Sequence, residues 1–365
     1  MGGVRDFDVV RYDGNMASGL TDGRDVVWRD MSEPPFRLSG LPFHRSGSDL
    51  RRLPELPEGA IPEAVDRLAW HTSGATLGFK TDSDRICLRV KLGCSKVMDH
   101  MTAVGSAGFD LYMGAPARRI FCAATRFPAN DLEYSVILMK DIPAEGVREY
   151  LLEFPLYSHV ESLEIGLAPG AELEAPTPWC SEKKVVIYGT SITQGGCASR
   201  PGMCMASMLS RRWNMEVVNL GFSGSGKGEP EVVKLVASVP DPALFVLDYV
   251  VNAGVKGFKA TLPGAIDIIR RRNPETPIAL LTPMHLCREL WKPNPAADFQ
   301  DVCAFMRDEA ERRRAAGDAN VHFVDGTVES PDWHEFMVDG VHLTDLGFYK
   351  QTELVAPQLE KLLWK

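Results

Sequence analysis

The chain contains 365 residues, of which 45% are hydrophobic and 24% are charged, and these values are typical of a globular protein with about two domains. Its 40 basic and 49 acidic side chains give a net charge of −9, which provides no electrostatic basis for binding nucleic acid or an anionic membrane. The apolar runs have the length of strands, such as Ala243–Leu247, and none approaches the ~20 residues of a membrane span.

Charged side chains interrupt the N-terminal segment from Arg5 onward, so no apolar region of a signal peptide is expected. The eight cysteines are scattered without a C-x-x-C pair, which argues against a small disulfide scaffold and a zinc ribbon. Together these features predict a cytoplasmic protein with reduced thiols.

Residues 1–178 are predicted to form an all-β domain, a sandwich or jelly roll, because short apolar runs alternate there with Gly, Pro and Asp. Between Gly74 and Gly93, two alternating runs flank a polar turn at Thr81–Asp84, which predicts a β-hairpin. The first ~60 residues are rich in Pro, Gly and Arg, and we expect loops and short strands there.

Residues 170–178 have the composition of a linker, and over residues 179–365 the pattern changes to strand, loop and helix. Apolar runs predict five parallel strands, namely KKVVIYG, EVVNLGF, ALFVLDYV, PIALLTP and VHFVD. The predicted helices are Pro201–Trp213, Glu229–Val239, a helix ending at Arg272, Ala296–Ala316 and Asp345–Leu363. This alternation predicts an α/β fold, in which helices cover both faces of a parallel sheet.

In such a sheet ligands bind beyond the C-terminal ends of the strands, and chemically useful residues follow three of them. Ser191 follows the first strand, where a serine either caps a helix or, if a base removes its proton, acts as a nucleophile. Gly224 lies in the glycine-rich loop after the second strand, whose amides are free to donate hydrogen bonds. Asn252 follows the third strand and either donates to an oxyanion or supports a turn.

The last predicted loop contains Asp339 and His342. Their spacing lets the carboxylate hold one imidazole nitrogen, so that the other nitrogen is free as a general base. This loop and the loops of Ser191, Gly224 and Asn252 should share one edge of the sheet, so four chemically complementary groups are expected there, a coincidence far less likely than any single motif.

These residues resemble the four sequence blocks of the SGNH (GDSL-like) hydrolase superfamily, with GTSI at Ser191, GFSG at Gly224, Asn252 as the third block and DGVH ending at His342. The segment Gly108–Tyr112 (GFDLY) resembles the motif of the branch that carries an N-terminal GxDLY β-domain, so the resemblance covers roughly residues 20–365. Two positions depart from that branch, since Ser225 replaces the usual Asn and Val251 replaces the usual Pro.

The resemblance implies a flavodoxin-like three-layer catalytic domain after a jelly-roll-like sandwich, and an esterase that uses no metal or other cofactor. Ser191 would be the nucleophile, His342 the base and Asp339 the residue that orients it. The amides of Ser191 and Gly224 and the Asn252 side chain would stabilise the oxyanion. The expected partner is a small-molecule ester, a short acyl group such as acetyl on a sugar or polyol, with no nucleic acid and no membrane; a homo-oligomer stays open.

Three alternatives stay open. Gly221–Lys227 nearly matches a phosphate-binding G-x-x-x-x-G-K-[ST] loop with Asp248 as its magnesium partner, but Gly228 replaces the required hydroxyl residue. The chain could instead be a non-catalytic carbohydrate-binding protein, or an acyltransferase that uses the same acyl-enzyme.

Three further side chains are candidates for substrate contacts. Trp333 and His334 precede the Asp339 loop and can stack on a sugar ring, although packing under that loop explains them equally well. Arg200 follows the nucleophile loop and can hold a polar group of the substrate, whereas the simpler expectation is a solvated arginine.

Overall fold

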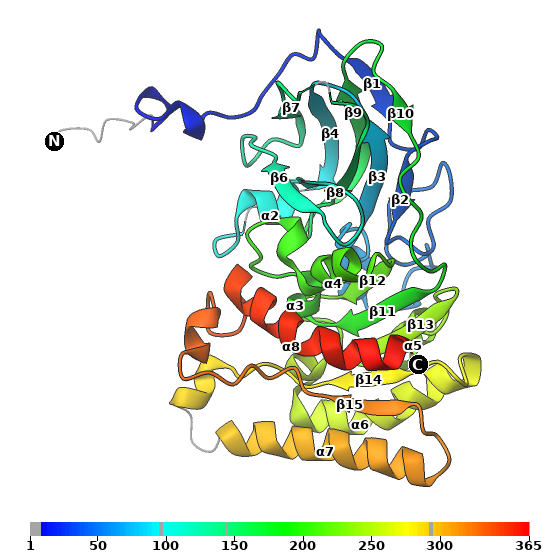
Figure 1. The fold of residues 1–365 in the computed structure, drawn as a ribbon. Helices are drawn as coiled ribbons and strands as arrows, with labels where there is room; N and C mark the ends of the chain where they lie inside the picture. Colours follow the sequence, from blue (N-terminus) through cyan, green and yellow to red (C-terminus); the bar gives the residue numbers. More distant parts are fainter. Residues whose placement is uncertain (1–8, 95–97, 144, 292–294, 365) are drawn as a thin grey trace, which may run out of the picture.

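The chain folds into an antiparallel part followed by a parallel part. The computed structural model describes residues 9–94, 98–143, 145–291 and 295–364. The antiparallel strands all precede Ala175, and the parallel strands begin at Lys184 (Figure 1). None of the helices within these described ranges is long and apolar enough to cross a membrane.

The N-terminal part is a sandwich of two antiparallel sheets. One sheet has the strand order β1-β9-β4-β7, and the other has the order β10-β3-β8-β5-β6 with β2 paired to β3. The strands are β1 (Val27–Asp30), β2 (Arg37–Ser39), β3 (Thr76–Thr81), β4 (Ile86–Cys94), β5 (Asp110–Met113), β6 (Ile120–Ala124), β7 (Glu133–Met139), β8 (Arg148–Glu153), β9 (His159–Leu167) and β10 (Leu173–Glu174). Leu77 and Phe79 of one sheet and Leu88 and Ile165 of the other share one buried core, because alternate side chains of a strand face the same side.

The hairpin predicted between Gly74 and Gly93 is wrong. Both strands exist, but β3 pairs with β2, β8 and β10, whereas β4 pairs with β7 and β9. The polar residues between them form a corner from one sheet to the other: the Thr81 hydroxyl donates to the carbonyl of Glu172 at 2.6 Å, and the Ser83 hydroxyl donates to the carbonyl of Arg85 at 2.6 Å. Both strands alternate in the same way whether they pair with each other or with distant strands, so the local pattern does not separate the two cases.

The C-terminal part is built on a five-stranded parallel sheet of order β12-β11-β13-β14-β15. Its strands are β11 (Lys184–Gly189), β12 (Val217–Gly221), β13 (Pro242–Asp248), β14 (Ile278–Leu281) and β15 (Val321–Val324). All five coincide with the predicted apolar runs, and the predicted α/β class is confirmed. The strand order changes side at β11, because β12 is added on one side of it and β13 on the other, and ligand sites of such sheets lie at that switch point, beyond the strand ends.

Helices cover both faces of this sheet and make it the middle of three layers (Figure 1). Val186 and Tyr188 of β11 face a core shared with α5, α6 and α7, whereas Val185 and Ile187 face a core shared with α4 and α8. The helices of this part are α3 (Ser191–Gln194), η3 (Pro201–Met203), α4 (Met205–Trp213), α5 (Pro230–Val236), α6 (Val250–Arg272), η4 (Cys287–Leu290), α7 (Pro295–Ala315), η5 (Trp333–Phe336) and α8 (Asp345–Leu363); the N-terminal part has η1 (Val9–Arg11), η2 (Gly14–Met16), α1 (Glu63–Leu68) and α2 (Ala103–Ala107).

Two helix predictions differ in detail from the structure. The helix predicted over Pro201–Trp213 is interrupted at Cys204, whose extended backbone separates the 3-10 turn η3 from α4. Asn252 lies in the first turn of α6 rather than in a loop, and the left-handed backbone of Gly254 (φ 65°) kinks that helix just after it. Asn252 therefore stays beyond the end of β13, at the edge where the other candidate residues lie.

Candidate active site

Ser191 lies at the first turn of α3, directly beyond the end of β11, and its residue is 5% exposed. The Thr190 side chain accepts a hydrogen bond from the Ile192 amide at 3.2 Å, and the Thr190 amide donates to Thr193 Oγ1 at 3.0 Å. These two bonds start the helix at Ser191. Gly189 must be glycine, because a Cβ there would lie 1.9 Å from Thr193 Oγ1.

Asp339 and His342 lie in a narrow loop that closes through a bridge between Met337 and Leu343. Asp339 Oδ1 accepts hydrogen bonds from the amides of Val341 at 3.0 Å and His342 at 2.8 Å, and Asp339 Oδ2 lies 2.7 Å from His342 Nδ1. The carboxylate can only accept, so the Nδ1 atom carries the proton and Nε2 is left with a lone pair.

His342 Nε2 lies 2.8 Å from Ser191 Oγ, although 151 positions separate the two residues in the sequence. Partial burial alone would raise the pKa of the Asp339 carboxyl, but the hydrogen bonds from His342 and Val341 outweigh burial and lower that pKa below its usual value. Asp339 is therefore ionised at neutral pH. The structure thus places an alcohol, an imidazole and a carboxylate in one hydrogen-bonded series.

The candidate oxyanion donors lie on the neighbouring strand ends. Gly224 adopts a left-handed backbone (φ 66°), and the following amides of Ser225 and Gly226 both donate to the Phe222 carbonyl at 2.9 Å. Asn252 Nδ2 donates to the same carbonyl at 3.1 Å, which attaches the start of α6 to this loop. For the residues that the structure describes, no hydrogen bond is recorded from the amides of Ser191 or Gly224, so both can serve a ligand.

Two buried polar side chains hold the nucleophile turn: Gln194, which no sequence pattern marked, and Asp248, which the sequence marked only as the magnesium partner of the phosphate-loop alternative. Asp248, at the end of β13, accepts a 2.6 Å hydrogen bond from the Thr193 hydroxyl, and burial raises its pKa to about 7. Gln194 donates to the Leu156 carbonyl at 3.0 Å and accepts from the Ser223 amide at 3.0 Å, so it connects α3 to both the sandwich and the Gly224 loop. The position of Gln194 and Asp248 close to the motif residues was the only sign of this role in the sequence. Their hydrogen-bond partners lie far away in the chain, so the sequence alone does not reveal them.

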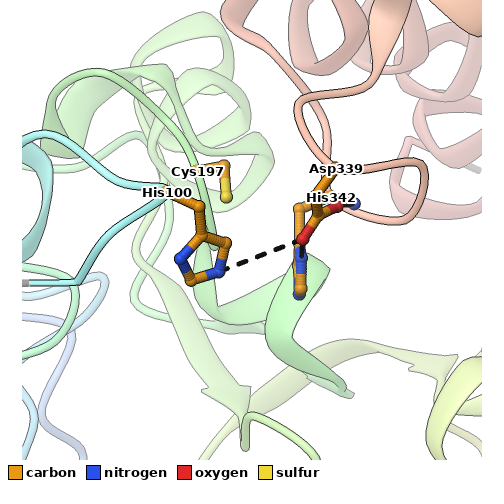
Figure 2. Close-up of side chains that lie close together, drawn as sticks. All are labelled: His100, Cys197, Asp339 and His342. Carbon is orange, nitrogen blue, oxygen red and sulfur yellow. Dashed lines mark hydrogen bonds and ion pairs between the residues drawn. The ribbon is translucent and has the colours of Figure 1, made fainter.

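The N-terminal sandwich also reaches the site. Tyr157 Oη lies 3.4 Å from the Ser191 carbonyl. The ring of His100 is 5.5 Å from that of His342 at an interplanar angle of 67°, and its Nε2 is 4.0 Å from Asp339 Oδ2 (Figure 2). The buried thiol of Cys197 completes this group, and its burial raises the pKa of that thiol to about 12. No local sequence pattern marks His100 as a neighbour of the last loop, so its place in the site could not be predicted.

Arg200 interacts with side chains of the N-terminal sandwich. Its guanidinium donates to Asp110 Oδ2 at 2.5 Å and to the Tyr112 hydroxyl, and it lies 3.9 Å from the ring centre of Phe121. Asp110 and Tyr112 belong to the GFDLY segment, and Asp110 Oδ1 also accepts from the Gly202 amide at 2.9 Å. Arg200 therefore connects the nucleophile loop to the sandwich. This corrects the simpler expectation of a solvated arginine, whereas a contact with the substrate stays a prediction.

Trp333 and His334 lie on η5, just before the Asp339 loop. The half-buried Trp333 ring packs 5.2 Å from the ring of His285, while the His334 side chain is exposed. Packing therefore accounts for Trp333, and the contact of either residue with a substrate stays a prediction.

The structure also bears on the phosphate-loop alternative. Asp248, the expected magnesium partner, is buried and bound to Thr193, and the amides of Ser225 and Gly226 are turned to the Phe222 carbonyl. A phosphate loop needs such amides free and its carboxylate accessible, so this alternative does not fit.

Two protein-family models match the chain. Residues 182–360 match the GDSL-like lipase/acylhydrolase family, and residues 26–173 match the N-terminal domain, named after its GxDLY motif, of SGNH hydrolase-type esterases. Among proteins with curated descriptions, none matches the chain.

Solved structures share the whole architecture. A Bacteroides ovatus protein assigned as a GDSL-like lipase is 27% identical, with a TM-score of 0.83 over 93% of this chain and 98% of its own. A salicylyl-acyltransferase from a tetracycline biosynthetic pathway is 22% identical, with a TM-score of 0.69 over 94% of this chain and 99% of its own. A family two carbohydrate esterase from Cellvibrio japonicus is 13% identical, with a TM-score of 0.59 over 93% and 98%; these last two show a shared fold.

Proposed function

The chain belongs to the GDSL-like lipase/acylhydrolase family and is an esterase, and from this premise we propose that it hydrolyses a short acyl ester, such as an acetyl ester, of a carbohydrate or similar polyol. The single observation that carries the proposal is the series Ser191 Oγ, His342 Nε2, His342 Nδ1 and Asp339 Oδ2, with successive hydrogen bonds of 2.8 and 2.7 Å.

The proposed reaction has two acyl-transfer steps. Ser191 Oγ attacks the ester carbonyl while His342 Nε2 takes its proton, and Asp339 stabilises the imidazolium that forms. The carbon–oxygen bond to the alcohol then breaks, and His342 returns the proton to the leaving oxygen. Water attacks the acyl-enzyme in the second step, with His342 again as the base, and releases the acid and free Ser191.

The negative oxygen formed in each step needs donors that are in place beforehand. We assign this role to the amides of Ser191 and Gly224 together with Asn252 Nδ2, whose present acceptor is the Phe222 carbonyl. Removing one such donor typically costs about 3–4 kcal/mol of barrier.

Two features support the proposed substrate class. Ser191 is only 5% exposed, and a Cβ at Gly196 would lie 3.0 Å from His342, so little room surrounds the nucleophile for a large acyl group. The carbohydrate esterase from Cellvibrio japonicus shares the fold over 93% of this chain, which favours a sugar as the alcohol part.

The test of the proposal is a comparison of Ser191→Ala with Ser225→Ala, a serine of the neighbouring loop whose side chain has no proposed role. On an aryl acetate we expect Ser191→Ala to lower kcat by at least about 10³-fold and Ser225→Ala to keep kcat within about threefold. A panel of acetylated, butyrylated and octanoylated sugars should then give its highest kcat/KM with the acetyl esters. Full activity of Ser191→Ala would overturn the assignment of the nucleophile, and a preference for octanoyl esters would overturn the proposed acyl length.

Acyl transfer to an acceptor alcohol is the second candidate function, because the salicylyl-acyltransferase has the same fold as this chain. Both functions use the same acyl-enzyme, so they differ only in which hydroxyl attacks it. The two are separated by adding free sugars to the assay and measuring the ratio of acylated sugar to free acid; hydrolysis predicts that free acid dominates at millimolar acceptor concentrations.

A further inference from the structure

Four side chains capable of binding a metal ion meet where the N-terminal sandwich approaches the last loop. They are His100, Cys197, Asp339 and His342, and one ligand atom from each lies within 4.8 Å of the others (Figure 2). His100 precedes α2 of the sandwich, Cys197 follows α3, and Asp339 and His342 precede α8. Three separate segments therefore converge on one point.

Among the described residues, neither the Cys197 thiol nor the His100 ring makes a hydrogen bond. No hydrogen bond is recorded there for the Cys197 thiol, although the residue is buried. His100 Nε2 faces Asp339 at 4.0 Å, beyond a hydrogen bond. His100 Nδ1 is buried, and its neighbour Asp99 Oδ1 lies 3.2 Å away outside hydrogen-bonding geometry.

This arrangement resembles the surroundings of metal-bound histidines. Such histidines commonly bind the ion through one ring nitrogen and direct the other to a carboxylate. Here Nε2 of His100 faces the cluster, and Asp99 Oδ1 lies 3.2 Å from Nδ1, where a small shift of the exposed Asp99 side chain would bring it into hydrogen-bonding geometry.

The chemistry of the four ligands favours one class of ion. A thiolate with two imidazoles and a carboxylate suits Zn²⁺ rather than Mg²⁺ or Ca²⁺, which prefer oxygen ligands alone. The thiolate and carboxylate charges also balance the two charges of the ion. Tetrahedral zinc needs ligand atoms about 3.3–3.8 Å apart, so the widest separation here must close by about 1 Å.

We propose that these four residues form an inhibitory site for Zn²⁺ that spans the two parts of the chain. On binding, Cys197 loses its proton to solvent and ligates as the thiolate. His342 ligates either through Nδ1, which removes it from Asp339, or through Nε2, which removes it from Ser191. In both cases the base is lost, and esterase activity stops until the ion is chelated.

The inhibition rests on the proposed function, so metal binding is measured separately from activity. Co²⁺ serves as the probe, because cysteine ligation gives it a near-ultraviolet charge-transfer band and zinc displaces it. We expect the reduced full-length chain to bind one Co²⁺ with this band, and Zn²⁺ to abolish the band. The Ser191→Ala variant should behave in the same way, since Ser191 is not a ligand.

The variants for this test remove ligands outside the proposed catalytic residues. Cys197→Gly suits the left-handed backbone at this position (φ 71°), and His100→Ala removes the ligand from the sandwich. Cys287→Ala, close to the Asp339 loop, and His44→Ala, on the surface of the sandwich part, are the matched controls, because they remove the same residue types outside the cluster. Cys197→Gly should lose the charge-transfer band, and both ligand variants should raise the Zn²⁺ concentration for half-inhibition by at least about tenfold, whereas the controls should leave it unchanged.

Three outcomes decide the proposal. Zinc inhibition that chelation reverses, and that Cys197→Gly and His100→Ala both weaken, supports it. Equal inhibition of all four variants, or Co²⁺ binding without the thiolate band, overturns it. If the band depends on Cys197 but no ester is hydrolysed, the metal site stands and the proposed function is wrong.

Discussion

At the scale of single residues, the site depends on the different hydrogen bonds that the two carboxylate oxygens of Asp339 accept. Oδ1 accepts from two backbone amides of its own loop, while Oδ2 is left for His342 Nδ1. The loop therefore holds the carboxylate in place independently of its hydrogen bond with the imidazole. Fixing Nδ1–H in this way leaves Nε2 to accept the proton of Ser191.

Replacing Asp339 by Asn tests the role of the Oδ2 atom in holding His342. The amide can preserve the shape of the loop, but it provides no negative charge for the imidazolium and can reverse the tautomer of His342. We expect Asp339→Asn to lower kcat on an aryl acetate by about 10³–10⁴-fold with little change in KM. Steady-state kinetics check this, and a loss below tenfold would show that the carboxylate does not assist the imidazole.

The residues that the sequence could and could not predict differ in a physical way. Ser191, Gly224, Asn252 and His342 could be found because parallel strands bring their C-terminal ends to one edge, whatever the details of packing. The partner of Arg200 could not be found, because a guanidinium is equally compatible with solvent, with a substrate and with Asp110, which lies 90 positions away. His100 went unnoticed for the same reason.

At the scale of elements, α3 is held at the sheet edge by a buried carboxyl group. Asp248 ends β13 and accepts from Thr193, while Thr193 Oγ1 accepts from the Thr190 amide. Burial raises the pKa of Asp248 to about 7 from an ordinary value of 3.8. Its contribution to stability is therefore complete below about pH 4 and is lost as the pH rises through 7, since the buried group must then ionise.

Asp248→Asn should remove this pH dependence, because the amide oxygen can still accept from Thr193 and carries no charge. We expect the variant to gain about 2–4 kcal/mol in free energy of unfolding relative to the wild type between pH 4.5 and pH 8. Urea unfolding across this range provides the measurement. A difference between the two proteins that stays constant with pH would mean that Asp248 does not titrate there.

Element predictions from the sequence succeeded where the pattern itself determines the partner. A continuous apolar strand followed by an amphipathic helix commonly joins a parallel sheet, and all five predicted strands lie in one such sheet. The strands β3 and β4 follow one another directly, yet each pairs with strands distant in sequence. Their alternation specifies which side chains are buried but not which sheet each strand joins.

At the scale of the whole molecule, buried charges connect the sandwich to the catalytic sheet. Asp110 and Glu153 of the sandwich have side chains that are 0% and 1% exposed, and they pair with Arg200 and Arg211 at 2.5 and 2.6 Å. Burial raises the pKa of Asp110 to about 6, and the charge of Glu153 adds to this. Each carboxylate is tolerated there because an arginine from the other part neutralises it.

Removing one charge from this interface should therefore be costly. We expect Asp110→Asn to lower the free energy of unfolding by about 3 kcal/mol, since it leaves Arg200 largely buried without its counter-charge. Glu164→Gln is the matched control, because Glu164 forms an ion pair with Arg89 whose side chains are 33% and 45% exposed. The control should change stability by less than about 1 kcal/mol. If urea unfolding gave the same loss of stability for both variants, the buried ion pair between Asp110 and Arg200 would be no more important than an exposed one.

If Ser191 carries the acyl group between the two steps, the acyl-enzyme can be trapped on it. A slowly hydrolysed aryl ester is mixed with the enzyme, the reaction is quenched in acid within its first turnover, and the peptides are examined by mass spectrometry. We expect one acyl group per chain, on the peptide that contains Ser191, and none in the Ser191→Ala variant. An acyl group on another residue, or turnover of the ester by Ser191→Ala at the wild-type rate, would contradict it.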